Sequence, residues 1–387
     1  MRAISASPPY WRLSGFYFFY FAVLGALAPS LSPYLKALGF TPTEIGVLFG
    51  TTMATRIIAP NIWGWIADHT GQRMRIVQIG SLLAALCFLG IFIEQTYIWL
   101  IVVLSTFSFF WNAALPQFEA TTFNHLSDQV NRYSTIRLWG SIGFILTVVG
   151  LGYLFEVVDI TFLPVIISIL LGLIWAVSLM VPESAAGHLH IDHEPLRKVL
   201  RKPHVLGLLL VCFCMQASHG PYYAVYSIYM ESYGYSSHTI GWFWGIGVIA
   251  EVIILLLMYR IVKLAPLSHL LMLSLLLAAL RWCLVALFPE HMSIMVLAQI
   301  LHAATFGLYH VVAIRLIHQF FTGRHQGRGQ ALYSSISFGL GGAIGSIYSG
   351  FAWDYLGRGW IFSLSVIFSL LGFWLAYRYV RPGPQPM

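Results

Sequence analysis

The stretch "YLKALGFTPTEIGVLFG" at residues 34–50 returns as "YMESYGYSSHTIGWFWG" at residues 229–245. Five of its residues recur 195 positions later: Tyr34, Gly39, Ile45, Gly46 and Gly50. A second match, "YSTI" at 133–136 and "YSSI" at 333–336, keeps the same order along the chain. The two matches keep their order, and their offsets of 195 and 200 residues are similar, which indicates an internal duplication. A duplication constrains the architecture of the whole chain, so it is considered before single motifs.

Composition assigns the duplicated unit to a membrane. The 387 residues are 58% hydrophobic and only 9% charged, with a mean hydropathy of +0.78. Soluble domains carry about 25% charged residues, so this chain lacks the charges that cover a soluble surface. Apolar runs of membrane-spanning length occur near 13–35, 45–66, 76–93, 97–118, 136–156, 160–181, 205–230, 239–259, 268–288, 293–317, 330–352 and 359–379. We therefore predict an all-α polytopic membrane protein with twelve transmembrane helices.

The runs divide into two equal sets. We expect an N-terminal six-helix bundle at 1–183, a polar cytoplasmic linker at 184–203 and a C-terminal six-helix bundle at 204–387. Six spans per half give both halves the same orientation, as parallel repeats. In transporters built in this way the substrate site lies near mid-membrane, at the interface of the repeats.

Charge sets the orientation. On the side opposite the two termini, the loops contain only Lys36 and Arg358 as basic residues, while the terminal side contains most of the others. This asymmetry predicts cytoplasmic N- and C-termini. The net charge of +7 is therefore a topology signal and does not indicate nucleic-acid binding. The four cysteines lie in apolar runs without metal-ligand spacing, so we expect no metal and no cofactor.

Ionisable residues within the spans are the first candidates for function. A charge at the bilayer centre costs roughly 2.5–3.5 kcal/mol, so such residues are retained for a role or are paired. Glu119 ends the fourth span and Arg137 begins the fifth, 18 residues later. We expect these two residues to pair and to bind substrate; a pair that only sets helix register is the alternative.

The duplication relates a second acid and base. Arg56 in the second span and Glu251 in the eighth span are 195 positions apart, and therefore occupy equivalent places. Equivalent positions can face each other across a central cavity, so we expect Arg56 to join the substrate site. An Arg56–Glu251 pair in one conformation is a further hypothesis.

The loop "GWIADHTGQR" at 64–73 has the form G-x-x-x-D-x-x-G-x-R and resembles the signature loop of the major facilitator superfamily. Four of its residues are expected to control conformation: Gly64, Asp68, Gly71 and Arg73. Gly64 would allow close helix approach, and Asp68 would pair with an arginine. The alternative is an ordinary charged turn. The corresponding loop of the second half, "YRIVKLAP" at 259–266, lacks the pattern.

Further motifs resemble those of one branch of this superfamily. The pattern of Glu119 followed by "RLWGSIGF" at 137–144 is similar to that of the lactose-permease and phenylpropionate-permease branch, where it implies substrate binding. "AEVIILLL" with Glu251, "LAALRW" with Arg281 and "ILHAATF" with His302 resemble the proton machinery of the same branch.

One position departs from that machinery, because Thr305 stands where the branch has a glutamate. The resemblance then implies Glu251 as the proton carrier, switched by Arg281, with His302 sharing the task. The alternatives are a packing Glu–Arg pair and a buried, hydrogen-bonded histidine. For His219 and His310 we expect the latter.

Aromatic residues suggest the substrate. Trp139 and Tyr223, together with Arg56 and Arg137, suit a small aromatic acid such as a phenylpropionate-like compound. We expect a monomeric proton symporter in the bacterial inner membrane, acting by alternating access on a small molecule. A sugar or nucleoside symporter, a proton-driven efflux antiporter and a non-transporting receptor on the same fold remain open. No ATP-binding loop of the form G-x-x-x-x-G-K-[ST] occurs, which favours a secondary transporter, and a membrane enzyme is disfavoured because no clustered nucleophile and base or H-E-x-x-H set is present.

Overall fold

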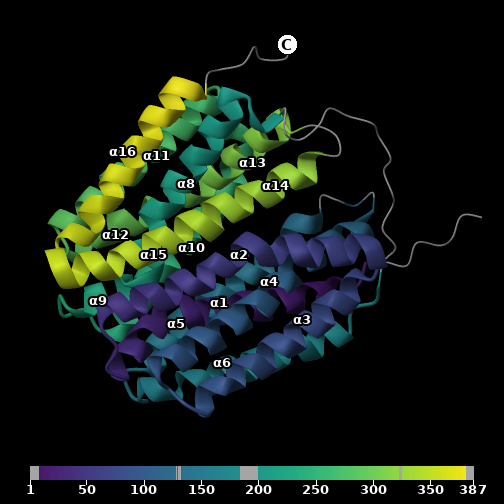
Figure 1. The fold of residues 1–387 in the computed structure, drawn as a ribbon, viewed down its shortest axis with the longest axis horizontal. Helices are drawn as coiled ribbons and strands as arrows, with labels where there is room; N and C mark the ends of the chain where they lie inside the picture. The colour runs from purple at the N-terminus through teal and green to yellow at the C-terminus, as the bar shows by residue number, and fades with distance from the viewer. Residues whose placement is uncertain (1–7, 128, 130–131, 184–198, 322–324, 381–387) are drawn as a thin grey trace, which may run out of the picture. The chain divides into compact units, whose positions relative to one another are not determined.

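The structure is a computed structural model that describes residues 8–127, 129, 132–183, 199–321 and 325–380. The described chain is helical throughout (Figure 1), and most of the expected linker, at 184–198, lies outside it. Lipid offers no hydrogen bonds to a backbone, so helices that satisfy their own amides are the natural solution for such an apolar chain. Within the described ranges, eleven helices are long and apolar enough to cross a membrane.

The first repeat contains its six expected spans. They are α1 (Tyr10–Ala37), α2 (Pro42–Thr70), α3 (Arg73–Phe88) continued by η1 (Leu89–Phe92), α4 (Tyr97–Leu126), α5 (Tyr133–Leu154), and α6 (Leu163–Leu179) preceded by η3 (Ile160–Phe162).

The second repeat is more broken. Its elements are α8 (Pro203–Ala224) with α9 (Tyr226–Glu231), α10 (Ser237–Ile261), α11 (Leu267–Leu287), α12 (Met292–Ile300) with η4 (Ala303–Leu308) and α13 (Tyr309–Phe320), α14 (His325–Ser334) with η5 (Ser335–Gly341), α15 (Gly342–Phe351) and η6 (Ala352–Leu356), and α16 (Trp360–Tyr379). Three of these, η4, η5 and η6, are π-helical turns. The eleventh expected span corresponds to the run from α14 to η6. The twelve-helix prediction is confirmed in architecture.

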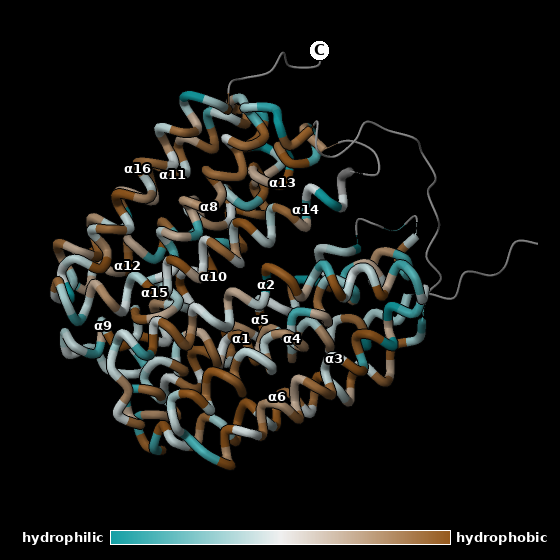
Figure 2. The backbone as a smooth tube through the Cα atoms, viewed as in Figure 1, coloured by the Kyte–Doolittle hydropathy of each residue, from teal (hydrophilic) through white to brown (hydrophobic). Residues whose placement is uncertain are grey.

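Apolar side chains cover the outside of the helices. Figure 2 shows long hydrophobic stretches along them. Ile98, Leu256 and Ile367 are 68%, 68% and 58% exposed. Exposed aliphatic side chains on spanning helices face lipid in a membrane protein, where they cost nothing.

The contacts divide the chain into two compact units. One comprises residues 1–27, 59–147 and 162–188, and the other comprises residues 28–58, 148–161 and 189–387. Two segments of the first repeat, 28–58 and 148–161, therefore pack with the second repeat inside the larger unit. The repeat boundaries themselves, at 183 and 204, stay a prediction from the sequence.

Small residues on α15 have two different partners in the larger unit. A Cβ at Gly345 would lie 2.5 Å from the Ala217 carbonyl of α8, so this face of α15 packs within the second repeat. A Cβ at Gly46 on α2 would lie 2.6 Å from the Ser346 carbonyl, so the adjacent face of α15 packs against the first repeat. Small residues on both faces allow these close helix contacts.

Candidate functional site

The loop between α2 and α3 forms an ion pair. Arg73 Nη2 donates to Asp68 Oδ1 at 3.2 Å, and Arg73 Nη1 donates to Gln117 Oε1 on α4 at 2.9 Å. Gly71 has φ of +67°, a conformation that favours glycine and turns the chain into α3. A Cβ at Gly64 would meet nothing within 4 Å among the described residues, and the close helix approach expected there stays a prediction.

Glu119 and Arg137 lie in one polar cluster of the first repeat. Tyr133 donates its hydroxyl to Glu119 Oε1 at 3.3 Å, and the charge of Arg137 acts on the same carboxylate. The Arg137 guanidinium stacks over the Phe21 ring at 3.9 Å and lies 5.6 Å from the Tyr17 ring. Among the described contacts the two do not form a direct ion pair, so their interaction in this conformation is longer in range.

Trp139 faces a different neighbourhood from Arg137. Its indole Nε1 donates to the Tyr10 hydroxyl at 3.1 Å, and its ring meets Trp11 edge-on at 5.6 Å. Residues two apart on a helix project in different directions, which explains why Trp139 reaches the start of α1 while Arg137 stacks on Phe21. In this conformation the structure does not bring Trp139 to the Glu119 cluster.

The second repeat contains a fully buried arginine. Arg281 on α11 is 0% exposed, and its guanidinium lies over the rings of Tyr222 at 4.6 Å and Trp282 at 4.4 Å. It donates to three neutral acceptors, listed here with their distances: His302 Nδ1 at 3.0 Å, Thr305 Oγ1 at 3.1 Å and Gln299 Oε1 at 3.3 Å. Its Nε has no hydrogen-bond partner within the described chain. Desolvating a charge is costly, and cation–π contacts and charge-assisted hydrogen bonds offset part of that cost.

Gln299 links Arg281 to two tyrosines through hydrogen bonds. The sequence alone did not single out this residue. Its Oε1 accepts from Tyr222 at 3.0 Å as well as from Arg281, while its Nε2 donates to the Tyr226 hydroxyl at 2.6 Å. The available signal was the spacing: Gln299 precedes His302 by three residues, which places both on one helix face.

His302 connects Arg281 to Glu251. An arginine can only donate, so His302 Nδ1 accepts, and the neutral ring carries its proton on Nε2. That nitrogen lies 3.8 Å from Glu251 Oε2 on α10. The three predicted coupling residues therefore form one chain, Arg281 to His302 to Glu251. The π-helical turn η4 begins directly after His302, and such turns are frequent at functional sites.

Thr305 takes over the acceptor role at the position where the branch has an acid. It accepts from Arg281, and its hydroxyl lies 3.4 Å from His219 Nε2. His219 Nδ1 lies 2.8 Å from the Met215 carbonyl, so this histidine is hydrogen-bonded on both sides, as expected. His310 is likewise hydrogen-bonded, with Nδ1 at 2.9 Å from the Tyr333 hydroxyl.

The charges of Arg56 and Glu251 both interact electrostatically with Tyr223. Arg56 on α2 and Tyr223 on α8 are half-buried, and the Tyr223 hydroxyl feels the charges of both Arg56 and Glu251. The side chain of Glu251 is 22% exposed, which leaves it in reach of water or of a ligand. The two repeat-related charges are thus within electrostatic range of one tyrosine.

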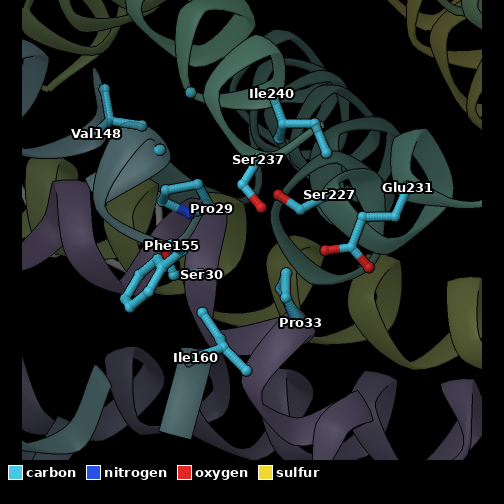
Figure 3. A pocket seen from close by; sticks show the side chains of 12 residues that line it. Pro29, Ser30, Pro33, Val148, Phe155, Ile160, Ser227, Glu231, Ser237 and Ile240 are labelled. Carbon is cyan, nitrogen blue, oxygen red and sulfur yellow. The ribbon is translucent and has the colours of Figure 1, made fainter. Parts of the chain in front are cut away.

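Cavities occur at the end of the larger unit that carries residues 33–37, 155–160 and 227–241, called the capped end below. One cavity of about 30 Å³ lies between Pro29, Gly152, Ser227 and Ser237 (Figure 3). A wider one of about 420 Å³ adjoins it, lined by Lys36, Asp159 and Glu231 among others. The inner cavity is large enough to hold ordered water. Within the described ranges, no cluster of three or more His, Cys, Asp or Glu could hold a metal ion.

Comparison with known proteins identifies the group to which the chain is similar. It is 27% identical to a probable 3-phenylpropionic acid transporter of Escherichia coli, over 92% of this chain and 94% of the relative. It is 25% identical to a maltose permease of Geobacillus stearothermophilus, over 92% and 91% of the two chains. These relatives are transporters and not enzymes.

Solved structures agree on the fold. A point mutant of the nucleoside transporter NupG matches with a TM-score of 0.85 at 16% identity, over 96% of this chain and all of that one. A bacterial homologue of the lysosomal transporter Spinster matches with a TM-score of 0.74 at 15% identity, over 99% of this chain and all of the other. The family model for the MFS_1-like family matches residues 10–364. Its repeats, its membrane-spanning helices and this match together show that the chain belongs to the MFS_1-like family, as a multi-pass membrane transporter of the major facilitator superfamily.

Proposed function

We propose that this transporter is a proton symporter that imports a small aromatic carboxylate. The observation that carries the proposal is the chain of Arg281, His302 and Glu251, which joins a buried cation to a partly exposed carboxylate through one histidine. The relative named as a probable 3-phenylpropionic acid transporter supports the substrate class.

The geometry suggests how a proton would be exchanged. While Arg281 donates to His302 Nδ1, that nitrogen cannot take a proton, and the ring stays neutral. If Arg281 moves away, Nδ1 becomes free to bind a proton, and a charged imidazolium then faces Glu251. Glu251 and His302 would thus share the proton, with Arg281 as the switch, and Thr305 replaces an acid without adding a third titrating group.

The substrate would meet charges from both repeats. Glu119, Arg137 and Arg56 would bind it, with the Arg137 fork available for a carboxylate. Tyr223, within range of Arg56 and Glu251, would connect the substrate to the proton chain. Trp139 would join only in a conformation that frees it from Tyr10.

Arg56 and Glu251 would pair directly in one conformation. Exchanging the two charges, as Arg56→Glu with Glu251→Arg, should restore part of the transport that each single substitution removes. A doubly exchanged protein as inactive as the single variants, yet still folded, would count against the pairing.

Proteoliposome uptake of labelled 3-phenylpropionate tests the proposal. An acid-outside pH gradient should drive accumulation, and a protonophore should abolish it. His302→Gln should lose this gradient dependence, while the matched control His310→Gln, on the same helical segment but bonded to Tyr333, should keep it. Uptake that ignores the gradient would overturn the coupling.

A sugar substrate is the second candidate. Glu119 accepts a hydrogen bond from the Tyr133 hydroxyl, and such a carboxylate suits a ligand rich in hydroxyl groups. One relative is named as a maltose permease. Maltose competing with 3-phenylpropionate in the same vesicles would favour this candidate. Export by antiport would instead appear as substrate efflux driven by the acid-outside gradient.

We further propose a monomer in the bacterial inner membrane with both termini in the cytoplasm, which places the capped end on the outer face. The excess of basic residues on the terminal side supports this orientation. A reporter fused to the C-terminus that is active only in the cytoplasm tests it, and light scattering of the purified protein tests the monomer.

A further inference from the structure

At the capped end, a carboxylate of one repeat caps the N-terminus of a helix of the other repeat, and this occurs twice. The amide of His238, the second residue of α10, donates to Glu156 Oε1 at 3.1 Å. The amide of Thr43, the second residue of α2, donates to Asp354 Oδ2 at 2.9 Å. Glu156 follows α5 in the first repeat and Asp354 lies within η6 in the second, so each cap bridges the two repeats.

The two caps are copies of one another. His238 lies 195 positions after Thr43, the offset that relates the repeats, and Asp354 lies 198 positions after Glu156. The helix starts are thus at equivalent positions, the acids lie within two or three residues of equivalent positions, and each acid contacts the helix start of the other repeat.

Each carboxylate accepts a hydrogen bond from a backbone amide that has no partner within its own helix. The first amides of a helix lack partners within the helix, and the positive end of the helix dipole favours an anion there. The residue before α10, Ser236, makes no side-chain cap, so Glu156 fills that role. In contrast, α2 already has a reciprocal cap between Thr41 and Glu44. Glu156 should therefore matter more than Asp354.

Additional contacts strengthen the α5–α10 cap. His238 Nδ1 lies 3.3 Å from Glu156 Oε1, and the His238 ring stacks on Tyr153 at 5.4 Å. Trp242 on α10 donates its indole proton to the Tyr153 hydroxyl at 3.2 Å. These bonds can form only while the two helix ends stay together.

We propose that Glu156 and Asp354 are positioning residues that hold the capped end shut, and that both caps break when the repeats separate there. Transport by alternating access requires the repeats to part at each end in turn. The helices held by the caps, α2 and α10, carry Arg56 and Glu251, so releasing the caps frees the two helices that present these charges. The proposal depends on the transporter fold and not on the proposed substrate or on proton coupling.

A cysteine reporter measures this opening directly. Ser30 is 6% exposed and lines the inner cavity, so Ser30→Cys, with the four native cysteines changed to alanine, should react slowly with a water-soluble maleimide. Glu156→Ala should raise that rate in purified protein by about fivefold, for a cap worth the usual amount of about 1 kcal/mol, and Asp354→Ala should raise it less. The double variant should raise it further, and Glu156→Gln, which keeps an acceptor, should raise it less than Glu156→Ala.

Asp159→Ala is the matched control. Asp159 lies in the same loop as Glu156 but accepts from the amide of its own neighbour Thr161 at 2.8 Å, and this bond does not bridge the repeats. Its removal should leave the Ser30→Cys rate unchanged. A second reporter, Ser178→Cys on α6, is buried inside the other unit and should stay unreactive unless the protein unfolds.

Three outcomes overturn the proposal. They are wild-type reactivity of Ser30→Cys in the double alanine variant, an equal increase in Asp159→Ala, and a rise at Ser178→Cys that parallels the rise at Ser30→Cys.

Discussion

Lys36 and Glu231 form an ion pair of 3.2 Å between positions 195 residues apart, which is the offset of the internal repeat. Each residue is thus the other's counterpart, and the pair lies where the two repeats meet at the capped end. Two like charges at these positions would repel, whereas the opposite charges that are present attract.

Exchanging this pair should preserve it. Lys36→Glu alone places two carboxylates together and should raise the reactivity of Ser30→Cys, by up to about fivefold, since exposed ion pairs contribute about 0.2–1 kcal/mol. Lys36→Glu with Glu231→Lys should return the rate to that of the parent. An exchanged protein as reactive as Lys36→Glu would show that the pair has no role in closure.

Arg281→Gln should separate coupling from binding. The substitution removes the donor for Gln299, His302 and Thr305, and each charge-assisted hydrogen bond contributes about 1.5–3 kcal/mol. Gradient-driven accumulation should fall at least about tenfold, whereas exchange of labelled for unlabelled substrate, which needs no net proton movement, should persist. Equal loss of both activities, with an unchanged melting temperature, would place Arg281 in substrate binding instead.

Acid should weaken the cap at Glu156. Hydrogen bonds from the His238 amide and then from its ring hold the pKa of Glu156 below its ordinary value of 4.5. A carboxyl with a lowered pKa stabilises the folded state above its unfolded pKa and loses that contribution as the pH falls through the folded pKa. The melting-temperature gap between wild type and Glu156→Gln should therefore be constant above about pH 5 and close below it. A gap that widens in acid would contradict the assignment.

A methyl group at either of two glycines should prop the capped end open. A Cβ at Gly46 would lie 2.6 Å from the Ser346 carbonyl, and one at its counterpart Gly241 would lie 2.7 Å from the Val148 carbonyl. Gly46→Ala and Gly241→Ala should each raise the reactivity of Ser30→Cys. Gly150→Ala on α5 is the control, because nothing in the described chain lies within 4 Å of its Cβ position, and its rate should match that of the parent.

Much of the fold could be predicted from the sequence, because lipid imposes long apolar helices and the duplication is visible in residues 34–50 and 229–245. The ion pair of Asp68 with Arg73 was also predictable, since both residues border one tight turn. The equivalence of Lys36 and Glu231 was present in the aligned repeats. That they touch was not, because contact depends on where the helices cross.

The rest depends on three-dimensional placement. Gln299 is an unremarked amide in an apolar run until Arg281 and two tyrosines surround it. The caps of Glu156 and Asp354 join residues 82 and 311 positions apart, beyond any local pattern. Gly64 fits the signature loop, but the packing expected of it is not found in the part of the chain that the structure describes.

The wide turn that follows His302 has a consequence for helix geometry. A π-turn holds one residue more than an α-turn, and one residue corresponds to about 100° of rotation around the axis. Relaxing that turn would therefore swing Tyr309, His310 and Arg315 round to a new face while His302 stayed in place. The half of the helix beyond residue 308 could thus rotate about the helix axis through a change in this one turn, while the rest of the helix kept its hydrogen bonds.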